Sequence, residues 1–255
     1  MAGHGCTSLA RLRLAPDTPT LPVPRITTVT GGQMGYCFSD LTATCQQDWH
    51  RYIEHDFVRT LGAGTLDQNA FRCYLQQDYL FLIHFARAYA LAAYKSRTLS
   101  DLRQAKAGLS TILDTELDLH VGFCRDWGIS ETDLAAVPEA RETLAYTRYV
   151  LEAGHRGDLL DLHVALAPCL IGYGEIATWL NTQPTTVRGA ANPFDAWITL
   201  YEGPEFQQAM VDEMAWLDAR LAEVGPRRFQ ELSQIFSEAT RLEIDFWQMG
   251  LDQRN

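Results

Sequence analysis

Apolar residues recur at the spacing of an α-helix along most of this 255-residue chain. In the stretch FRCYLQQDYLFLIHFARAYALAAYKS, which starts at Phe71, they follow one another about three or four residues apart, as on the buried face of a helix. Hardly any segment shows the alternation of apolar and polar residues that marks a half-buried strand. The pattern therefore predicts an all-α fold built as a single domain.

Capping residues, glycines and prolines divide this pattern into roughly eight expected helices. Residues 1–35 are rich in proline and lack a helical period, so we expect a flexible N-terminal extension before a helical domain over 36–255. The first helix is expected from about Ser39 to Gly62–Gly64. The later helices are expected to begin near Asp67, Ser100, Pro138, Asp158, Asn192–Pro193, Pro204 and Pro226.

One strongly apolar stretch, LAPCLIGYGEIATWL at residues 166–180, carries a thiol and a phenol. Cys169 and Tyr173 are four residues apart, which places them on one face of a helix. Gly172 lies between them and is expected to leave room beside the backbone. This combination indicates a small polar site inside a buried helix, although a lone cysteine or tyrosine is also common in an inert core.

Three other apolar segments hold polar groups as well. Asp78 lies in QQDYLF, Tyr146 in LAYTRY and Glu243 in RLEIDFWQM. A carboxylate among aromatic side chains is costly unless it is paired or protonated, so two of them from distant segments predict a shared polar site. The alternative is that each carboxylate is paired with an arginine, such as Arg87 or Arg241.

Composition narrows the functional classes. The net charge of −11 argues against nucleic acid as a partner, because phosphate binding requires clustered positive charge. We expect no membrane span, because no apolar run approaches the roughly 18 residues that one needs, and the N-terminus lacks the apolar core of a secretory signal. The six cysteines form no CxxC pair, so we expect free thiols in a reduced, cytoplasmic protein.

A metal site is the main rival interpretation. Glu116 and His120 are four residues apart, and helical bundles can hold two iron ions with sets of Glu and Glu-x-x-His ligands. The chain has no pair of E-x-x-H motifs, so we interpret Glu116 and His120 as a polar pair on one helix face and expect no metal. Neither a nucleophile elbow nor a glycine-rich phosphate loop is present, so no nucleotide cofactor is implied.

The same segments, in this order, resemble the TenA family, the thiaminase II group. The resemblance covers about residues 38–250 and includes ELDLHVGFCRDWGIS and NPFDAWITLYEGPEFQQAM besides the segments above. It implies a heme-oxygenase-like helical bundle, usually a homotetramer, that needs no cofactor. It also implies hydrolysis of the small molecule 4-amino-5-aminomethyl-2-methylpyrimidine, and more weakly of thiamin, in thiamin salvage.

The resemblance assigns roles to individual residues. The PC-x-x-x-Y motif implies that Cys169 is the nucleophile, and the E-x-x-F-W motif implies that Glu243 is the acid/base. Asp78 would contact the edge of the aminopyrimidine, while Phe81 stands where the family usually has a tyrosine, so one hydrogen bond to the site is lost. The other implied substrate contacts are Tyr146, Tyr173, Tyr201 and Phe246.

This assignment carries two expectations about ionisation. Because the thiolate is the reactive form of cysteine, neighbours are expected to lower the pKa of Cys169. The aromatic residues around Glu243 are expected to raise its pKa, which suits a general acid. Two alternatives stay open: a metal-dependent or cofactor-free oxidase on the same fold, and a non-catalytic regulator.

Overall fold

The computed structural model describes residues 35–253, apart from the side chains of Thr115, Leu119 and Ala135. The predicted flexible extension over residues 1–35 therefore lies almost entirely outside the described residues. Within 35–253 the regular structure is helical and contains no strand, as the periodicity predicts. The helices are α1 (Phe38–Thr44), α2 (Gln46–Ile53), α3 (Asp56–Gly62), α4 (Gln68–Lys95), α5 (Leu99–Thr111), η1 (Ile112–Glu116), α6 (Leu117–Asp126), α7 (Glu131–Ala136), α8 (Arg141–Arg156), α9 (Leu159–Ala167), η2 (Pro168–Gly172), α10 (Tyr173–Thr182), η3 (Gly189–Ala191), α11 (Asp195–Glu202), α12 (Pro204–Leu221) and α13 (Pro226–Asp252).

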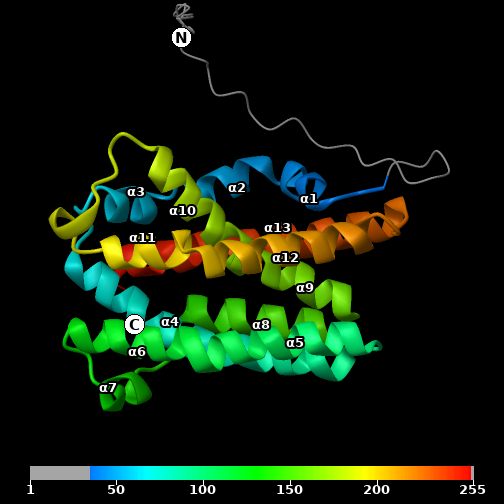
Figure 1. Ribbon diagram of the computed structural model, residues 1–255, viewed down its shortest axis with the longest axis horizontal. Coiled ribbons are helices and arrows are strands. Elements are labelled where there is room, and N and C mark those ends of the chain that lie inside the picture. The colour runs from blue at the N-terminus through cyan, green and yellow to red at the C-terminus, as the bar shows by residue number, and fades with distance from the viewer. Residues whose placement is uncertain (1–34, 254–255) are drawn as a thin grey trace, which may run out of the picture.

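Helix α13 runs through the middle of the bundle (Figure 1). It packs against α4, α8 and α9 on one side and against α1, α2 and α3 on the other. Its buried residues form a broad face that includes the fully buried Trp247 and Phe236, while Gln234, Arg241 and Gln248 are exposed on the opposite face. This broad buried face explains why the last helix contributes both to the core and to the polar groups enclosed in it.

The prediction of one continuous first helix from about Ser39 to Gly62–Gly64 is wrong, because this segment forms the three short helices α1, α2 and α3. Cys45 separates α1 from α2, and Glu54–His55 separates α2 from α3. The ring of His55 accepts a hydrogen bond from the backbone N–H of Phe57 and so caps α3. The breaks let the chain bend around α13, with Trp49, Tyr52 and Phe57 all buried.

The other predicted boundaries are close to those of the structure. Asp67 and Asp158 are N-caps, and Pro204 and Pro226 are the first residues of their helices, as expected. The prediction at Pro138 is wrong, because α8 begins three residues later. There Gln77 of α4 accepts hydrogen bonds from the backbone N–H of Ala140 and the hydroxyl of Thr143. A side chain from a distant helix thus fixes this start, which local sequence signals do not reveal.

The expectation that no apolar run is long enough to span a membrane is wrong for Leu159–Thr182. This helical stretch is long enough and apolar enough to cross a membrane, with a mean hydropathy of 1.4. In the fold, however, 72% of its most apolar window is buried inside the molecule. Its hydrophobicity is therefore that of a core helix, packed against α13 and α12.

Candidate functional site

The polar residues singled out from the sequence come together from five separate segments. Asp78 and Phe81 come from α4, Tyr146 from α8, and Glu243 from α13. Phe246 also comes from α13, and η2, α10 and α11 supply Cys169, Tyr173 and Tyr201. All of them are buried except the partly exposed Cys169; they are Asp78, Phe81, Tyr146, Cys169, Tyr173, Tyr201, Glu243 and Phe246.

Asp78 lies at the centre of a small hydrogen-bonded network. Its Oδ2 accepts from the Tyr74 hydroxyl at 3.2 Å and lies 3.3 Å from Nδ1 of His120. The Tyr74 hydroxyl accepts in turn from the indole N–H of Trp197 at 3.1 Å. Burial raises the pKa of Asp78 to about 7, although the Tyr74 hydrogen bond opposes this rise.

The tautomer of His120 can be assigned. Nε2 of His120 lies 2.6 Å from the backbone carbonyl of Leu75, which can only accept, so Nε2 carries a hydrogen. Burial lowers the pKa of His120 to about 4, so the ring is neutral and its Nδ1, which faces Oδ2 of Asp78, is an acceptor. His120 therefore brings no positive charge to Asp78.

Glu243 pairs with a tyrosine rather than with a positive charge. Its Oε1 accepts a hydrogen bond of 2.9 Å from the Tyr146 hydroxyl, and both side chains are fully buried. Burial raises the pKa of Glu243 to about 8, with a further contribution from Asp78. The predicted direction is confirmed, and Glu243 holds its proton at neutral pH.

The suggested arginine partners are not used. Arg241 forms its ion pair with Glu238, and Arg87 lies against the ring of His84. Neither Asp78 nor Glu243 forms an ion pair with an arginine or lysine among the described residues. Two carboxyl groups are thus buried without a cationic partner, and their raised pKa values increase the protonated fraction of both near pH 7, as in sites whose chemistry needs an acid.

Cys169 lies in a π-helical turn, η2, inside the otherwise continuous helix from α9 to α10. Pro168 has no N–H to donate and its ring crowds the preceding turn, which accounts for the wider turn at this point. The Tyr52 hydroxyl donates to the freed carbonyl of Pro168 at 3.0 Å. Turns of this kind are frequent at functional sites, because they turn a side chain away from the regular helical direction.

Gly172 serves packing rather than a ligand. A Cβ on this residue would lie 2.3 Å from the Tyr52 ring, so the space expected beside the backbone is filled by Tyr52. The absence of a side chain at Gly172 lets α2 approach η2 closely. The same tyrosine thus packs against the turn and caps its carbonyl, and both contacts hold Cys169 in place.

The expected lowering of the pKa of Cys169 is wrong. Burial raises it well above its usual value, and the negative charges of Glu243, Asp78 and Glu116 add to the effect. Neither a lysine nor an arginine is among the groups that shift it. The free protein therefore holds Cys169 as a thiol, and an attack on a ligand requires that its proton be transferred to a base.

Aromatic rings surround these groups. The centroid of the Phe81 ring lies 5.0 Å from that of Tyr146 and 5.7 Å from that of Phe246. Phe81 is about one turn from Asp78 in α4, and Phe246 is about one turn from Glu243 in α13. Tyr173 and Tyr201 lie 4.9 Å apart on another side. Such rings provide flat apolar surfaces suited to a planar ligand.

The predicted pairing of Glu116 with His120 is wrong. The His120 ring is turned toward Leu75 and Asp78, and Glu116 forms no hydrogen bond or ion pair with any described residue. No group of three or more metal-binding side chains occurs among the described residues. Sequence reasoning also missed Tyr74 as the partner of Asp78 and Trp197 as the partner of Tyr74; only the spacing of Tyr74 and Asp78, one helical turn apart, indicated the first.

Comparison with known proteins identifies the family. Residues 42–253 match the model of the TENA/THI-4/PQQC family. The chain belongs to this family. It is 35% identical over 218 residues to the aminopyrimidine aminohydrolase of Halalkalibacterium halodurans, covering 85% of this chain and 96% of that one.

Solved structures agree with the helical fold. A protein described as a TenA family transcription regulator from Silicibacter sp. TM1040 superposes with a TM-score of 0.79 and 45% identity, covering 85% of this chain and 97% of that one. A domain with a heme oxygenase-like fold from Shewanella denitrificans superposes with a TM-score of 0.66 over 85% of this chain and 93% of that one, at only 9% identity. The expected heme-oxygenase-like bundle is confirmed.

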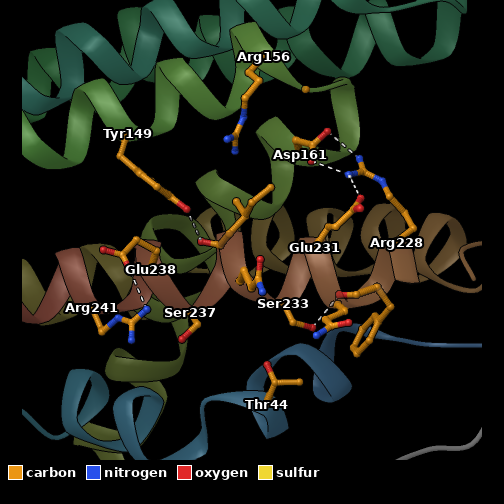
Figure 2. A pocket seen from close by; sticks show the side chains of 15 residues that line it. Thr44, Tyr149, Arg156, Asp161, Arg228, Glu231, Ser233, Ser237, Glu238 and Arg241 are labelled. Carbon is orange, nitrogen blue, oxygen red and sulfur yellow. Dashed lines mark hydrogen bonds and ion pairs between the residues drawn. The ribbon is translucent and has the colours of Figure 1, made fainter. Parts of the chain in front are cut away.

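A surface pocket of 980 Å³ lies away from these groups, between α8, α9 and α13 (Figure 2). Arg228 binds Asp161 there at 2.6 Å, and Arg241 binds Glu238 at 2.6 Å. None of the predicted site residues lines it. Its charged groups largely neutralise one another, so we assign the chemistry of the protein to the buried site.

Proposed function

We propose that this TENA/THI-4/PQQC family member is an aminopyrimidine aminohydrolase, or thiaminase II, of thiamin salvage. The substrate would be 4-amino-5-aminomethyl-2-methylpyrimidine, with thiamin itself as a second candidate. The observation that carries the proposal is the meeting of a thiol, Cys169, with two carboxyl groups of raised pKa, Asp78 and Glu243, in one buried site lined by aromatic rings. The relative named aminopyrimidine aminohydrolase supports the reaction class.

Asp78 has the chemistry to bind the pyrimidine. The edge of an aminopyrimidine offers an amino donor beside a ring nitrogen acceptor. A carboxyl group can match both, and Oδ1 of Asp78 has no hydrogen bond to another described residue. An analogue that lacks the amino group would leave this buried carboxyl unpaired, so it would be rejected. Tyr146, Tyr173, Tyr201, Phe81 and Phe246 would pack against the ring.

The proposed reaction is covalent catalysis by Cys169. The ionised form of Glu243, a minor fraction at pH 7, takes the thiol proton; the sulfur forms a bond to a ring carbon, and an electron pair of the ring moves toward the carbon that carries the substituent. The C–N bond of the substituent then breaks and ammonia leaves. Water adds to the exocyclic carbon, its proton is taken up, and the C–S bond breaks to return the thiol. The net change replaces C–NH₂ by C–OH and releases ammonia, and it divides one hard step into easier ones.

Glu243 would move the protons in this sequence. With a pKa of about 8 it holds its proton at neutral pH but can release it readily, which suits a group that alternates between acid and base. The Tyr146 hydroxyl, bonded to it at 2.9 Å, fixes the orientation of the carboxyl group. General acid–base catalysis of this kind typically contributes about 10²- to 10⁴-fold in rate.

The resemblance to the TenA family supports two further proposals. We propose that the protein acts as a homotetramer and that it works in the cytoplasm. The free cysteines and the strongly acidic composition are consistent with a reduced compartment and with a small-molecule partner rather than nucleic acid. Size-exclusion chromatography with light scattering tests the tetramer directly.

The first experiment measures ammonia release from 4-amino-5-aminomethyl-2-methylpyrimidine. We expect turnover by the wild type and a loss of several orders of magnitude in Cys169→Ser, because the nucleophile is gone. Cys37→Ser is the matched control, since this partly exposed thiol lies at the start of α1 and is not a predicted site residue. Full activity of Cys169→Ser would refute the assigned nucleophile. Oxygen consumption without ammonia release would favour the oxidase alternative instead.

A further inference from the structure

Glu116 ends a second π-helical turn. Within residues 35–253 the π-turns are η1, which ends at Glu116, and η2, which contains Cys169. Helix α4, which carries Asp78, packs against η1. π-Helical turns are frequent at functional sites, and each of these two turns carries an ionisable side chain, Cys169 in η2 and Glu116 in η1. We therefore place Glu116 in the same site as Cys169.

The surroundings of Glu116 agree with this placement. It lies one helical turn before His120, whose Nδ1 is 3.3 Å from Oδ2 of Asp78, and both η1 and α6 pack against α4. Burial, with a smaller contribution from Asp78, raises the pKa of Glu116 to about 7. Glu116 is thus the third carboxyl group of the site, beside Asp78 and Glu243.

Glu116 differs from the other two because it has no partner. Asp78 is bonded to Tyr74 and His120, and Glu243 is bonded to Tyr146. Glu116 is half-buried and forms no hydrogen bond or ion pair with any described residue, so its carboxyl group is available to a ligand. No arginine or lysine of residues 35–253 forms an ion pair with any of these three carboxyl groups. A site with such a charge distribution favours a cationic ligand.

We propose that Glu116 binds the ammonium group on the C5 substituent of the substrate and thereby sets the preference for a positively charged substituent. The inference rests on the proposed function and names a specificity residue for it. An alkylamine is protonated at neutral pH, so the substituent would arrive as a cation. Asp78 would hold the ring edge while Glu116 accepts from the ammonium group, and the neutral hydroxymethyl product would lose that charged contact on leaving.

The test compares two ligands that differ in this charge. Calorimetry on the Cys169→Ser protein, which cannot turn over, would give dissociation constants for the 5-aminomethyl pyrimidine and the neutral 5-hydroxymethyl pyrimidine. Adding Glu116→Gln should weaken binding of the aminomethyl compound about 10- to 100-fold, as expected for loss of a charged hydrogen bond. Binding of the hydroxymethyl compound should stay within about threefold.

Two further variants control the result. Asp114→Asn removes one negative charge from an exposed position of the same turn and should leave both dissociation constants unchanged. Glu116→Asp keeps the charge and should recover part of the preference for the aminomethyl compound; it also replaces Glu116→Gln if that variant fails to fold, as judged by thermal unfolding.

Equal weakening of both ligands by Glu116→Gln, or no weakening of either, would overturn the inference while the hydrolase proposal stands. Absence of binding of either pyrimidine to Cys169→Ser, together with no ammonia release by the wild type, would overturn the proposed function and this inference with it. The two failures are therefore distinguishable.

Discussion

At the scale of single residues, burial controls ionisation in this protein more than pairing does. Burial raises the pKa of Asp78 to about 7 and that of Glu243 to about 8, and it raises the pKa of Cys169 well above its usual value. The buried tyrosine hydroxyls bonded to the carboxyl groups are neutral donors and leave them uncompensated by positive charge. The site is thus set to hold protons, and its nucleophile must be activated when the substrate is bound.

This state of Cys169 can be measured by alkylation. We expect iodoacetamide to modify Cys169 slowly at pH 7 and faster as the pH rises, because only the thiolate reacts. In Glu243→Gln the profile should move to lower pH by about one unit or less, since a neighbouring negative charge has been removed. Mass spectrometry of the Cys169 peptide gives the rate at each pH.

Glu175→Gln is the matched control for this experiment. It removes a carboxylate from α10, where Glu175 accepts from the Trp49 indole at 2.9 Å and is not among the groups that shift the pKa of Cys169. Its profile should match the wild type. If both variants behaved alike, Glu243 would not be an electrostatic neighbour of Cys169.

At the scale of elements, the decisive feature is the π-turn η2. The α9–η2–α10 stretch contains a proline in mid-helix, and the chain accommodates it by widening one turn. Tyr52 of α2 then satisfies the Pro168 carbonyl and packs against the Cα of Gly172. A helix 116 residues away in sequence from Pro168 therefore holds the turn that carries Cys169.

Gly172→Ala tests this packing. The new Cβ would lie 2.3 Å from the Tyr52 ring, so we expect a loss of about 1–3 kcal/mol in the free energy of unfolding and a loss of activity. Gly122→Ala in α6 is the control, because a Cβ there meets nothing within 4 Å and should stabilise the helix by up to about 1 kcal/mol. Urea denaturation measures both. If the Gly172→Ala protein were as stable as the wild type, the Tyr52 ring would be able to move away from the new methyl group at little cost, and the packing argument would be wrong.

At the scale of the whole molecule, the packing of other helices around the central helix α13 brings several carboxyl groups into one site. Glu243 on α13 faces groups from α4, α8 and η2, so the site forms only when these elements pack together. The folded state therefore holds three carboxyl groups of this region with raised pKa values, the buried Asp78 and Glu243 and the half-buried Glu116. This makes the stability of the whole chain depend on pH.

We expect the free energy of unfolding to fall as pH rises from about 5 to 8. A carboxyl group with a raised folded pKa binds more protons in the folded state, so its stabilisation is present at low pH and is lost as pH passes through the folded value. Burial lowers the pKa values of three histidines, which act in the opposite direction below their unfolded values: His55, His84 and His120. They stand against five carboxyl groups with raised pKa values, since Glu175 and Asp245 add to the three above. Urea denaturation at several pH values measures the slope.

The variant Glu243→Gln should flatten this slope, because the amide cannot ionise. Glu152→Gln, which changes an exposed carboxylate of α8, should keep the slope of the wild type. A protein whose stability is constant from pH 5 to 8, or an equal slope in both variants, would contradict the raised pKa values.

The sequence by itself determined the helical class and the starts of several long helices. These follow from local chemistry: apolar residues at helical spacing in α4, N-caps at Asp67 and Asp158, and prolines in the first turns of α12 and α13. Sequence motifs also singled out Cys169, Asp78 and Glu243 as candidates, because a polar residue within an apolar run is visible without coordinates. Their roles remain predictions until the variants are measured.

Only the tertiary structure decided what surrounds those candidates. The partner of Glu243 is Tyr146, 97 residues away, and His120 contacts Asp78 rather than Glu116. The start of α8 depends on Gln77, the space beside Gly172 is filled by Tyr52, and the pKa of Cys169 rises rather than falls. Helical period and caps depend on residues a few positions apart, whereas burial and electrostatic fields depend on groups brought together only when distant helices pack.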